Sequence, residues 1–305
     1  MRKFLYKSIT AGSIIVFTLL MFDVAISYNL RHSPKAILNS FNDIYNDTTC
    51  YDLVVMGNSR AYVQYSPRIL DSLLSLSSYN LGFNGQGIDW QMVKYMKYCE
   101  CHGNPKFYIQ NIDLFTMQKS TGFQRELFYP YFYDYSLLSH LERYSDIYSN
   151  SEKYIPLYRY KNYFKDFYIY HNDTILYKGF CPKDLLWDGK TLEKLDSILI
   201  NVDVDIKNEW VTFLKNEQLK GVKILFVYAP VHHLVRDKML NESYMYNIYD
   251  SIATQLNISI LDYNNDSMCY DTTYFYNGTH LNRKGAEIFT TKLAHDIDSL
   301  GLLKE

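Results

Sequence analysis

The stretch YDLVVMGNSRAY, Tyr51–Tyr62, begins with apolar residues and ends with polar ones. Its first part, Asp52–Met56, has the length and β-branched composition of a buried strand. Gly57 interrupts the strand, and Ser59 follows two residues later. In open parallel sheets, ligands bind beyond the carboxyl ends of the strands, because loops and helix starts meet there. We therefore expect Ser59 to lie at a functional edge of a sheet.

Short apolar runs alternate with amphipathic segments along most of the remaining chain. This pattern predicts four further strands, at Ser78–Leu81, Lys106–Ile112, Val222–Tyr228 and Ile258–Leu261. It predicts five helices, near Pro67–Leu76, Ile88–Cys101, Asp205–Gln218, Tyr244–Leu256 and Arg283–Ile297. Short connections are typical of parallel strands joined by crossover helices. We therefore expect a three-layer α/β/α fold with a five-stranded, mainly parallel sheet.

The alternation stops between about residues 115 and 197. This part is rich in aromatic residues, as in FYPYFYDYSLL (Phe128–Leu138), and has no clear period. We interpret it as a cap inserted into an α/β domain that covers residues 50–305. Its rings could stack on sugars, although packing inside the cap is the more ordinary explanation of an aromatic stretch.

The N-terminal segment, residues 1–28, has the pattern of a membrane-targeting sequence. Three basic residues precede an apolar run from Ile9 to Phe22, which continues past Asp23 to about Ile26. Positive charges before such a run keep the N-terminus inside, so the rest of the chain should lie across the membrane. Counted through Ile26, the run is just long enough to span; stopped at Asp23, it has the length of a cleavable signal. We favour an uncleaved anchor, followed by a polar linker at residues 29–49.

Composition excludes some classes of protein. The chain has 305 residues and is 48% hydrophobic, which is enough for a full core. Its net charge of -2 offers no basic surface for a phosphate backbone, so we expect no nucleic-acid partner. The five cysteines are odd in number and irregularly spaced, which predicts neither a disulfide framework nor a zinc site.

A serine is a poor nucleophile unless a base accepts its proton. The stretch YFYNGTHLNRKGAEIF (Tyr274–Phe289) places His280 in a loop just before the last predicted helix. Taken alone, the residues around Ser59 could simply form a turn in which this serine caps a helix. A histidine at the same sheet edge instead favours a serine–histidine pair.

Three stretches together resemble the SGNH (GDSL-like) hydrolases, and especially the membrane-anchored cell-envelope branch of the DltD and alginate O-acetylation proteins. They are VVMGNSRAYVQYSP (Val54–Pro67), YNLGFNGQG (Tyr79–Gly87) and THLNRKGAEIF (Thr279–Phe289). The resemblance implies that Ser59 is the nucleophile and His280 the general base. It also implies an oxyanion hole that includes the backbone N–H groups of Ser59 and Gly82.

Two departures from the family pattern bear on the oxyanion hole and the base. The usual Gly-x-Asn-Asp block is replaced by IQNIDLF, so Asn111 is the candidate for the oxyanion-hole amide, with Asn84 as its rival. The aspartate that the family has three residues before the histidine is here Asn277. An aspartate fixes the tautomer of the imidazole and stabilises imidazolium, so its loss should be costly.

Other residues could replace the missing carboxylate or add to the site. Asp266 and Asp271 lie upstream of His280 and could orient it, as could a backbone carbonyl. His232 and His233 follow the fourth strand, where they could act as base or metal ligand, although paired loop histidines are more often structural. Two charged residues complete the candidates: Arg60, which could bind an anionic substrate or form a salt bridge, and Asp113, which could orient Asn111 or a loop.

The resemblance implies an extracytoplasmic serine esterase or O-acyltransferase. Its substrates would be acyl groups, acetyl above all, on cell-envelope or secreted glycans, and its partner could be a membrane-bound acyltransferase. This mechanism requires no metal and no organic cofactor. The alternative is a catalytically weak or inactive domain that binds glycan or that acyltransferase, because Asn277 replaces the carboxylate. A nucleotide-binding Rossmann domain has little support, since GFNGQG does not match Gly-x-Gly-x-x-Gly.

Overall fold

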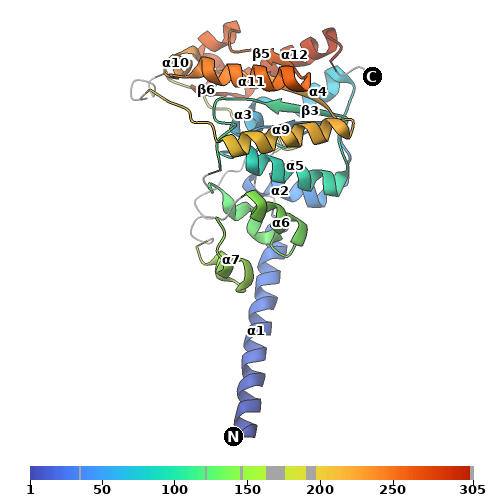
Figure 1. The fold of residues 1–305 in the computed structure, drawn as a ribbon, viewed down its shortest axis with the longest axis vertical. Helices are drawn as coiled ribbons and strands as arrows, with labels where there is room; N and C mark the ends of the chain where they lie inside the picture. The colour runs from blue at the N-terminus through green and yellow to red at the C-terminus, as the bar shows by residue number, and fades with distance from the viewer. Residues whose placement is uncertain (34–35, 121, 145–146, 163–175, 190–196, 303–305) are drawn as a thin grey trace. The chain divides into compact units, whose positions relative to one another are not determined.

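The computed structural model describes residues 1–305 except 34–35, 121, 145–146, 163–175, 190–196 and 303–305 (Figure 1). The chain divides into two compact units. Unit 1 comprises Met1–Asn42 and Gln124–Asp173, and unit 2 comprises Asp43–Phe123 and Thr174–Glu305. The aromatic stretch expected as one cap is therefore divided between the units, and four parts of it (121, 145–146, 163–175 and 190–196) lie outside the described residues.

Unit 2 contains the central sheet. Its strands are β1 (Leu53–Met56), β2 (Ser78–Asn80), β3 (Phe107–Asn111), β4 (Lys223–Tyr228) and β5 (Ser259–Asp262). They lie in the order β2-β1-β3-β4-β5, and every neighbouring pair is parallel. The predicted five-stranded α/β fold is confirmed. A separate antiparallel hairpin consists of β6 (Phe275–Asn277) and β7 (His280–Leu281).

The five helices predicted for this unit are confirmed to within two residues at each end. They are α4 (Pro67–Leu74), α5 (Ile88–His102), α9 (Val204–Leu219), α11 (Glu242–Leu256) and α12 (Arg283–Ser299). Four short helices were not predicted: α3 (Ser59–Gln64), α10 (His233–Arg236), η4 (Ser267–Tyr270) and η5 (Thr272–Tyr274). Each is shorter than two turns, so it shows no apolar period in the sequence.

Alternate residues of the strands face opposite layers, and both faces of the sheet are covered (Figure 1). On one face, Leu53 and Val55 belong to the same buried cluster as Phe289 of α12. On the other face, Trp210 of α9 stacks on Phe226 of β4 with ring centroids 5.3 Å apart. Because both faces are buried, the strands are almost continuously apolar and end abruptly at their polar edges.

Unit 1 contains α1 (Arg2–Arg31), the start of α2 (Ala36–Asn46), η1 (Arg125–Tyr131), α6 (Tyr135–Tyr144), α7 (Asn150–Tyr154) and η2 (Tyr158–Tyr160). Helix α1 is long and apolar enough to cross a membrane, and its apolar window is almost entirely exposed. The expectation of a linker at residues 29–49 is wrong over α2. Leu38, Phe41 and Ile44 recur at helical spacing and are buried, which explains why this segment is a helix.

Gly82 allows the loop after β2 to approach the start of the neighbouring helix. A Cβ atom at this position would lie 2.3 Å from the backbone nitrogen of Tyr62 and 2.8 Å from the carbonyl carbon of Ala61. Backbone atoms cannot yield as a flexible side chain can, so we expect Gly82→Ala to lower the free energy of unfolding by about 2–3 kcal/mol. Gly221→Ala, where φ is +88° and the space is open, should cost only about 1–2 kcal/mol of backbone strain. Chemical unfolding of the purified chain checks this, and equal effects would contradict it.

Candidate active site

The turn after β1 is built so that Ser59 begins a helix at the carboxyl edge of the sheet. Gly57 has φ +154°, and a Cβ there would lie 2.6 Å from Cβ of Ala61 and 2.8 Å from Cβ of Asn111. Only glycine therefore fits at this position. The Asn58 side chain accepts a hydrogen bond of 3.0 Å from the backbone N–H of Arg60, which caps α3.

The β6–β7 hairpin brings the histidine to this turn. Nε2 of His280 lies 2.7 Å from Oγ of Ser59, although 221 residues separate them in the chain. This is hydrogen-bonding distance for a serine that transfers its proton to a general base. The two residues that the sequence pairs as nucleophile and base are thus in contact.

Asn277 occupies the place of the third residue in a catalytic triad. Its Oδ1 lies 2.9 Å from Nδ1 of His280 and accepts a hydrogen bond of 3.0 Å from the backbone N–H of Thr279. A backbone N–H can only donate, so the atom facing it must be the amide oxygen. The same oxygen then accepts from Nδ1–H of His280, which leaves Nε2 unprotonated and facing Ser59. Asn277 therefore holds the imidazole in the tautomer that a general base towards Ser59 would need.

Thr279 is a site residue that the sequence analysis missed. Its Oγ1 lies 2.8 Å from Nδ1 of His280 and donates a hydrogen bond of 3.1 Å to Oδ1 of Asn277. Asn and Thr side chains commonly bond to nearby backbone groups in turns, so the letters NGT before the histidine contain the signal. The ring of Tyr276 stacks on the other side, with its centroid 5.3 Å from that of His280.

The electrostatic environment keeps His280 neutral. Burial, assisted by the positive charge of Arg60, lowers the pKa of His280 from its ordinary value of 6.5 to about 3. No carboxylate bonds to this imidazole within the described residues. The neutral form needed to accept a proton is therefore favoured, whereas the imidazolium formed during the reaction is not stabilised by a negative charge.

Arg60 and Asp113 form a buried ion pair beside the nucleophile. Nη2 of Arg60 lies 3.3 Å from Oδ2 of Asp113, which also accepts a hydrogen bond from Nδ2 of Asn58. The other carboxylate oxygen accepts a bond of 2.7 Å from the backbone N–H of Phe115. Asp113 thus orients Asn58 and Arg60, so the salt-bridge alternative for Arg60 is the one realised here.

The expected oxyanion-hole donors differ in their availability. The N–H of Gly82 already donates to Oδ1 of Asn80 at 2.8 Å, so the structure does not support Gly82 as a free donor. Oδ1 of Asn111 accepts a bond of 2.8 Å from the Tyr65 hydroxyl, whereas its Nδ2 is buried with no partner in the described part of the chain. Asn84 lies in a turn and is only partly buried. Asn111 packs under Gly57, is fully buried and is not among the residues that line the cavity beside Ser59, so its role as oxyanion-hole donor stays a prediction.

Neither of the alternative carboxylates bonds to His280. Asp266 accepts a bond of 2.9 Å from the backbone N–H of Met268 and pairs with Lys292. Asp271 accepts a bond of 2.9 Å from the backbone N–H of Thr273. Both carboxylates therefore cap short helices, and the structure assigns neither of them the orienting role.

The paired histidines after β4 also lie outside the pair formed by Ser59 and His280. His232 is buried against Trp187, with ring centroids 4.8 Å apart. The ring of His233 stacks on Tyr270 at 4.7 Å. Their contacts are those of packed side chains rather than of a second base.

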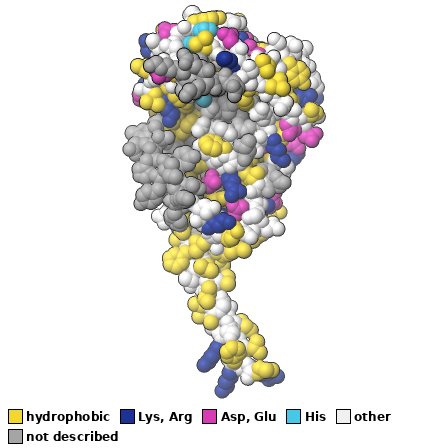
Figure 2. All heavy atoms as spheres, turned by 90° about the vertical axis from the view of Figure 1, so that its left-hand side faces the viewer, with side chains coloured by type: hydrophobic (Ala, Val, Ile, Leu, Met, Phe, Trp, Pro, Cys, Tyr) yellow, Lys and Arg dark blue, Asp and Glu magenta, His cyan; other side chains and the backbone are white. Residues whose placement is uncertain are grey.

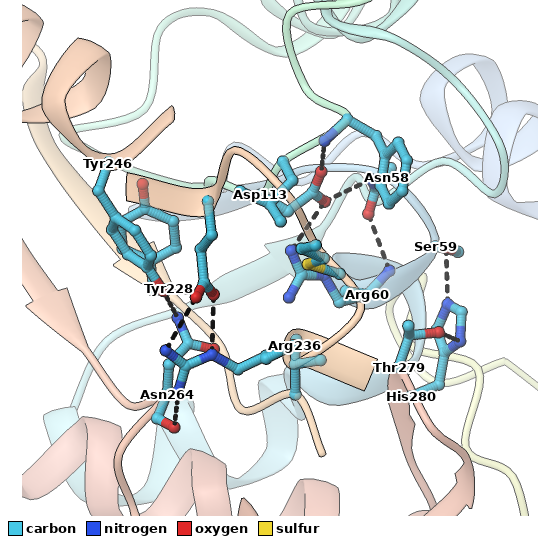
Figure 3. A pocket seen from close by; sticks show the side chains of 15 residues that line it. Asn58, Ser59, Arg60, Asp113, Tyr228, Arg236, Tyr246, Asn264, Thr279 and His280 are labelled. Carbon is cyan, nitrogen blue, oxygen red and sulfur yellow. Dashed lines mark hydrogen bonds and ion pairs between the residues drawn. The ribbon is translucent and has the colours of Figure 1, made fainter. Parts of the chain in front are cut away.

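A cavity of about 160 Å³ opens beside Ser59 at the carboxyl ends of β1, β3 and β4 (Figure 3). Ser59, Thr279 and His280 line one end, and Arg60 with Asp113 lies in the middle. The far end holds Arg236 and Glu242, which form a two-point ion pair with N–O distances of 2.8 and 3.3 Å. Apolar side chains complete the wall: Leu114, Phe115, Val231 and Met239.

No family model matches this chain, and no curated protein does. Among solved structures, a protein of Bacteroides fragilis described provisionally as an acylhydrolase is 11% identical, with a TM-score of 0.41, and the match covers 84% of this chain and 88% of that one. A protein of Streptococcus pneumonia described provisionally as a platelet activating factor is 10% identical, with a TM-score of 0.42 and coverage of 97% and 98%. A Chitinophaga pinensis protein described provisionally as a lipase is 12% identical, with a TM-score of 0.41 and coverage of 83% and 99%.

The low pKa of His280 predicts an unusual pH profile. The imidazole is neutral at any pH above its folded pKa, so we expect kcat/KM for ester hydrolysis to stay flat from pH 8 down to about pH 5. In the unfolded chain the same histidine protonates near pH 6.5. The folded state should therefore lose stability as the pH falls from 6.5 towards 3. An acidic limb centred between pH 6 and 7 would contradict this assignment.

Replacement of Asn277 by aspartate separates orientation from charge. A carboxylate would accept the same Nδ1–H bond and also stabilise imidazolium, so Asn277→Asp should raise kcat/KM at pH 8 by about tenfold or more. It should also raise the pKa of His280 and introduce an acidic limb that the parent lacks. Asn277→Ala, which removes the acceptor, should lower the rate. If both variants behave like the parent, Asn277 does not act on His280.

Proposed function

We propose that this protein is an SGNH-like serine esterase or O-acyltransferase. The contact of 2.7 Å between Oγ of Ser59 and Nε2 of His280, with the imidazole oriented by Asn277, is the observation that carries the proposal. In the first half-reaction, His280 accepts the hydroxyl proton and Oγ attacks the acyl carbonyl. The ester C–O bond then breaks, and the departing alcohol takes the proton from His280.

The second half-reaction regenerates the serine. Water or a sugar hydroxyl loses its proton to His280 and attacks the acyl carbon. The bond to Oγ of Ser59 then breaks, and Oγ takes the proton from His280, which restores the serine hydroxyl and the neutral imidazole. Water gives a free acid, and a sugar hydroxyl gives a new ester. The carbonyl oxygen of each intermediate needs hydrogen-bond donors, for which we propose the N–H of Ser59 and Nδ2 of Asn111.

We propose a short, uncharged acyl group such as acetyl as the group transferred. A cavity of about 160 Å³ has room for a short chain, and its two arginines are each paired with a carboxylate. No unpaired charge among these four residues would favour an ionic group. The buried hydroxyl of Tyr228 has no hydrogen-bond partner in the described part of the chain, so it could donate to an oxygen of the bound group. The family resemblance supports an acylated envelope or secreted glycan as the substrate.

We propose further that α1 is an uncleaved membrane anchor and that the catalytic unit is extracytoplasmic. Asp23, which interrupts the apolar run, is fully buried and pairs with the buried guanidinium of Arg159. Cleavage of the helix beyond Asp23 would leave Arg159 buried without this carboxylate, and breaking a buried pair in this way costs about 3–5 kcal/mol. The ion pair therefore argues that the helix is retained in the folded protein.

The second candidate function is a binding domain with little or no catalysis. The observation that favours it is the uncharged Asn277, because imidazolium formed at His280 has no carboxylate partner. Such a domain would keep the cavity and bind an acylated glycan without turning it over.

A fluorophosphonate probe distinguishes the two. Because the probe reacts with a serine that a base activates, the full-length protein in detergent should be labelled at Ser59. Ser59→Ala should abolish labelling and ester hydrolysis, and His280→Ala should lower both by at least about 10². Asn58→Ala, next to the nucleophile, is the control for local damage to the turn and should keep labelling above that of His280→Ala. A folded parent that resists the probe would favour the binding domain.

A further inference from the structure

We propose that unit 1 binds the lipid–water interface through an exposed surface formed by Tyr133, Tyr154, Ile155 and Tyr158, here called the aromatic rim. The inference rests on the proposed membrane anchor and adds a second contact with the same bilayer. It gives the inserted part of the chain a role that core packing does not explain.

The length of α1 sets the depth of Asp23. The stretch from Phe4 to Phe22 is about 28 Å long at 1.5 Å per residue, close to the roughly 30 Å of a bilayer's hydrocarbon core. Its one charged residue, Lys7, lies in the first turn of this stretch, where its long side chain can extend back to the headgroups. Basic side chains gather at the N-terminal end of the helix, and apolar ones cover its length (Figure 2). With that end at one boundary, Asp23 lies at the other boundary, where the polar headgroups begin.

The inserted part of unit 1 is bound to α1 at the level of Asp23. Asp23 accepts hydrogen bonds from the Tyr133 hydroxyl at 2.7 Å and from the backbone N–H of Leu157 at 2.6 Å, besides its ion pair with Arg159. Four residues further along α1, Oγ of Ser27 lies 2.8 Å from the Tyr160 hydroxyl. Two turns of the anchor are thus bound to η2, to the residue before it and to the turn after η1, so the depth of α1 in the membrane fixes the depth of these segments.

The aromatic rim lies next to these contacts. Ile155 and Tyr154 precede Leu157 by two and three residues, so their backbones are within about 7 and 11 Å of it. Helix α7, which ends at Tyr154, packs against η2, the segment that contacts α1. The four side chains of the aromatic rim are apolar or aromatic and yet are exposed to solvent. The exposed fraction is 69% for Tyr154, 51% for Ile155, 49% for Tyr133 and 37% for Tyr158.

The chemistry of the rim fits the interface better than water or hydrocarbon. Tyrosine rings are enriched at membrane boundaries, because the ring is apolar and the hydroxyl can stay among headgroups. Lys161, whose ammonium lies 3.9 Å from the centroid of the Tyr158 ring, adds a positive charge suited to lipid phosphates. Exposed apolar side chains clustered at the depth of a membrane boundary indicate that lipid covers them.

Tryptophan substitution with brominated lipids tests this in the full-length protein. The variants Tyr154→Trp and Ile155→Trp are reconstituted in phosphatidylcholine nanodiscs with or without bromine on the acyl-chain carbons nearest the headgroup. Phe17→Trp, with bromine near the chain ends, reports whether α1 spans the bilayer. Leu219→Trp, on an exposed site of unit 2, measures non-specific quenching. The native Trp90, Trp187 and Trp210 are buried and give a constant background.

We expect the added emission of Tyr154→Trp and Ile155→Trp to fall by about half in shallow-brominated lipid, as bromine quenches on contact. If Phe17→Trp is quenched but the two rim variants behave like Leu219→Trp, the rim does not touch lipid and this inference fails while the anchor stands. A rim emission that is blue-shifted but unquenched would mean that protein covers it, which also overturns the inference. If Phe17→Trp is not quenched, α1 is not a span, and the proposed anchoring fails together with the rim.

Discussion

One backbone hydrogen bond, from the N–H of Thr279 to Oδ1 of Asn277, determines the chemistry available at the site. Without it, an asparagine in a triad can turn its NH₂ group towards the histidine, and the imidazole then carries its proton on the wrong nitrogen. That is the main reason why aspartate-to-asparagine changes are so damaging in the serine proteases. Here the amide is held with its oxygen towards His280, because a backbone N–H accepts nothing. The unprotonated Nε2 consequently faces Ser59.

Orientation and charge, which one aspartate usually supplies together, are separated in this protein. Asn277 supplies the orientation, and no carboxylate in the part of the chain that the structure describes supplies the charge. The nearby Arg60 cation makes imidazolium still less favourable and so helps to lower the pKa of His280. If His280 acts as the proposed base, it is neutral at any pH above its lowered pKa but weak, since the driving force for taking up a proton falls with that pKa. We therefore expect a high barrier and an activity that persists at mildly acidic pH.

The sequence predicted the fold well because each strand is a short β-branched run that ends at a polar edge, and long helices have a visible period. The contact between Ser59 and His280 could be expected because Ser59 follows β1 and His280 shortly precedes the last helix, although the β6–β7 hairpin that places His280 was not predicted. The oxyanion-hole donors and the partners of the nearby carboxylates could not be predicted in this way. Whether Gly82 has a free N–H depends on the side chain of Asn80, and whether Asp266 or Asp271 reaches His280 depends on which nearby N–H each one caps. Such choices among neighbouring partners leave no periodic signal.

The partner of Asp23, near the N-terminus, was equally hard to predict from the sequence. An ionisable residue in an apolar run predicts that the membrane-spanning segment ends there, because an unpaired carboxylate is costly in a low-dielectric medium. The residue that resolves this is Arg159, 136 positions away in an aromatic stretch without a period. Once the two are paired, the carboxylate no longer interrupts the helix, which continues to Arg31. The inserted stretch then has a physical reason for its composition: it must surround a buried ion pair while part of its own aromatic surface stays outside.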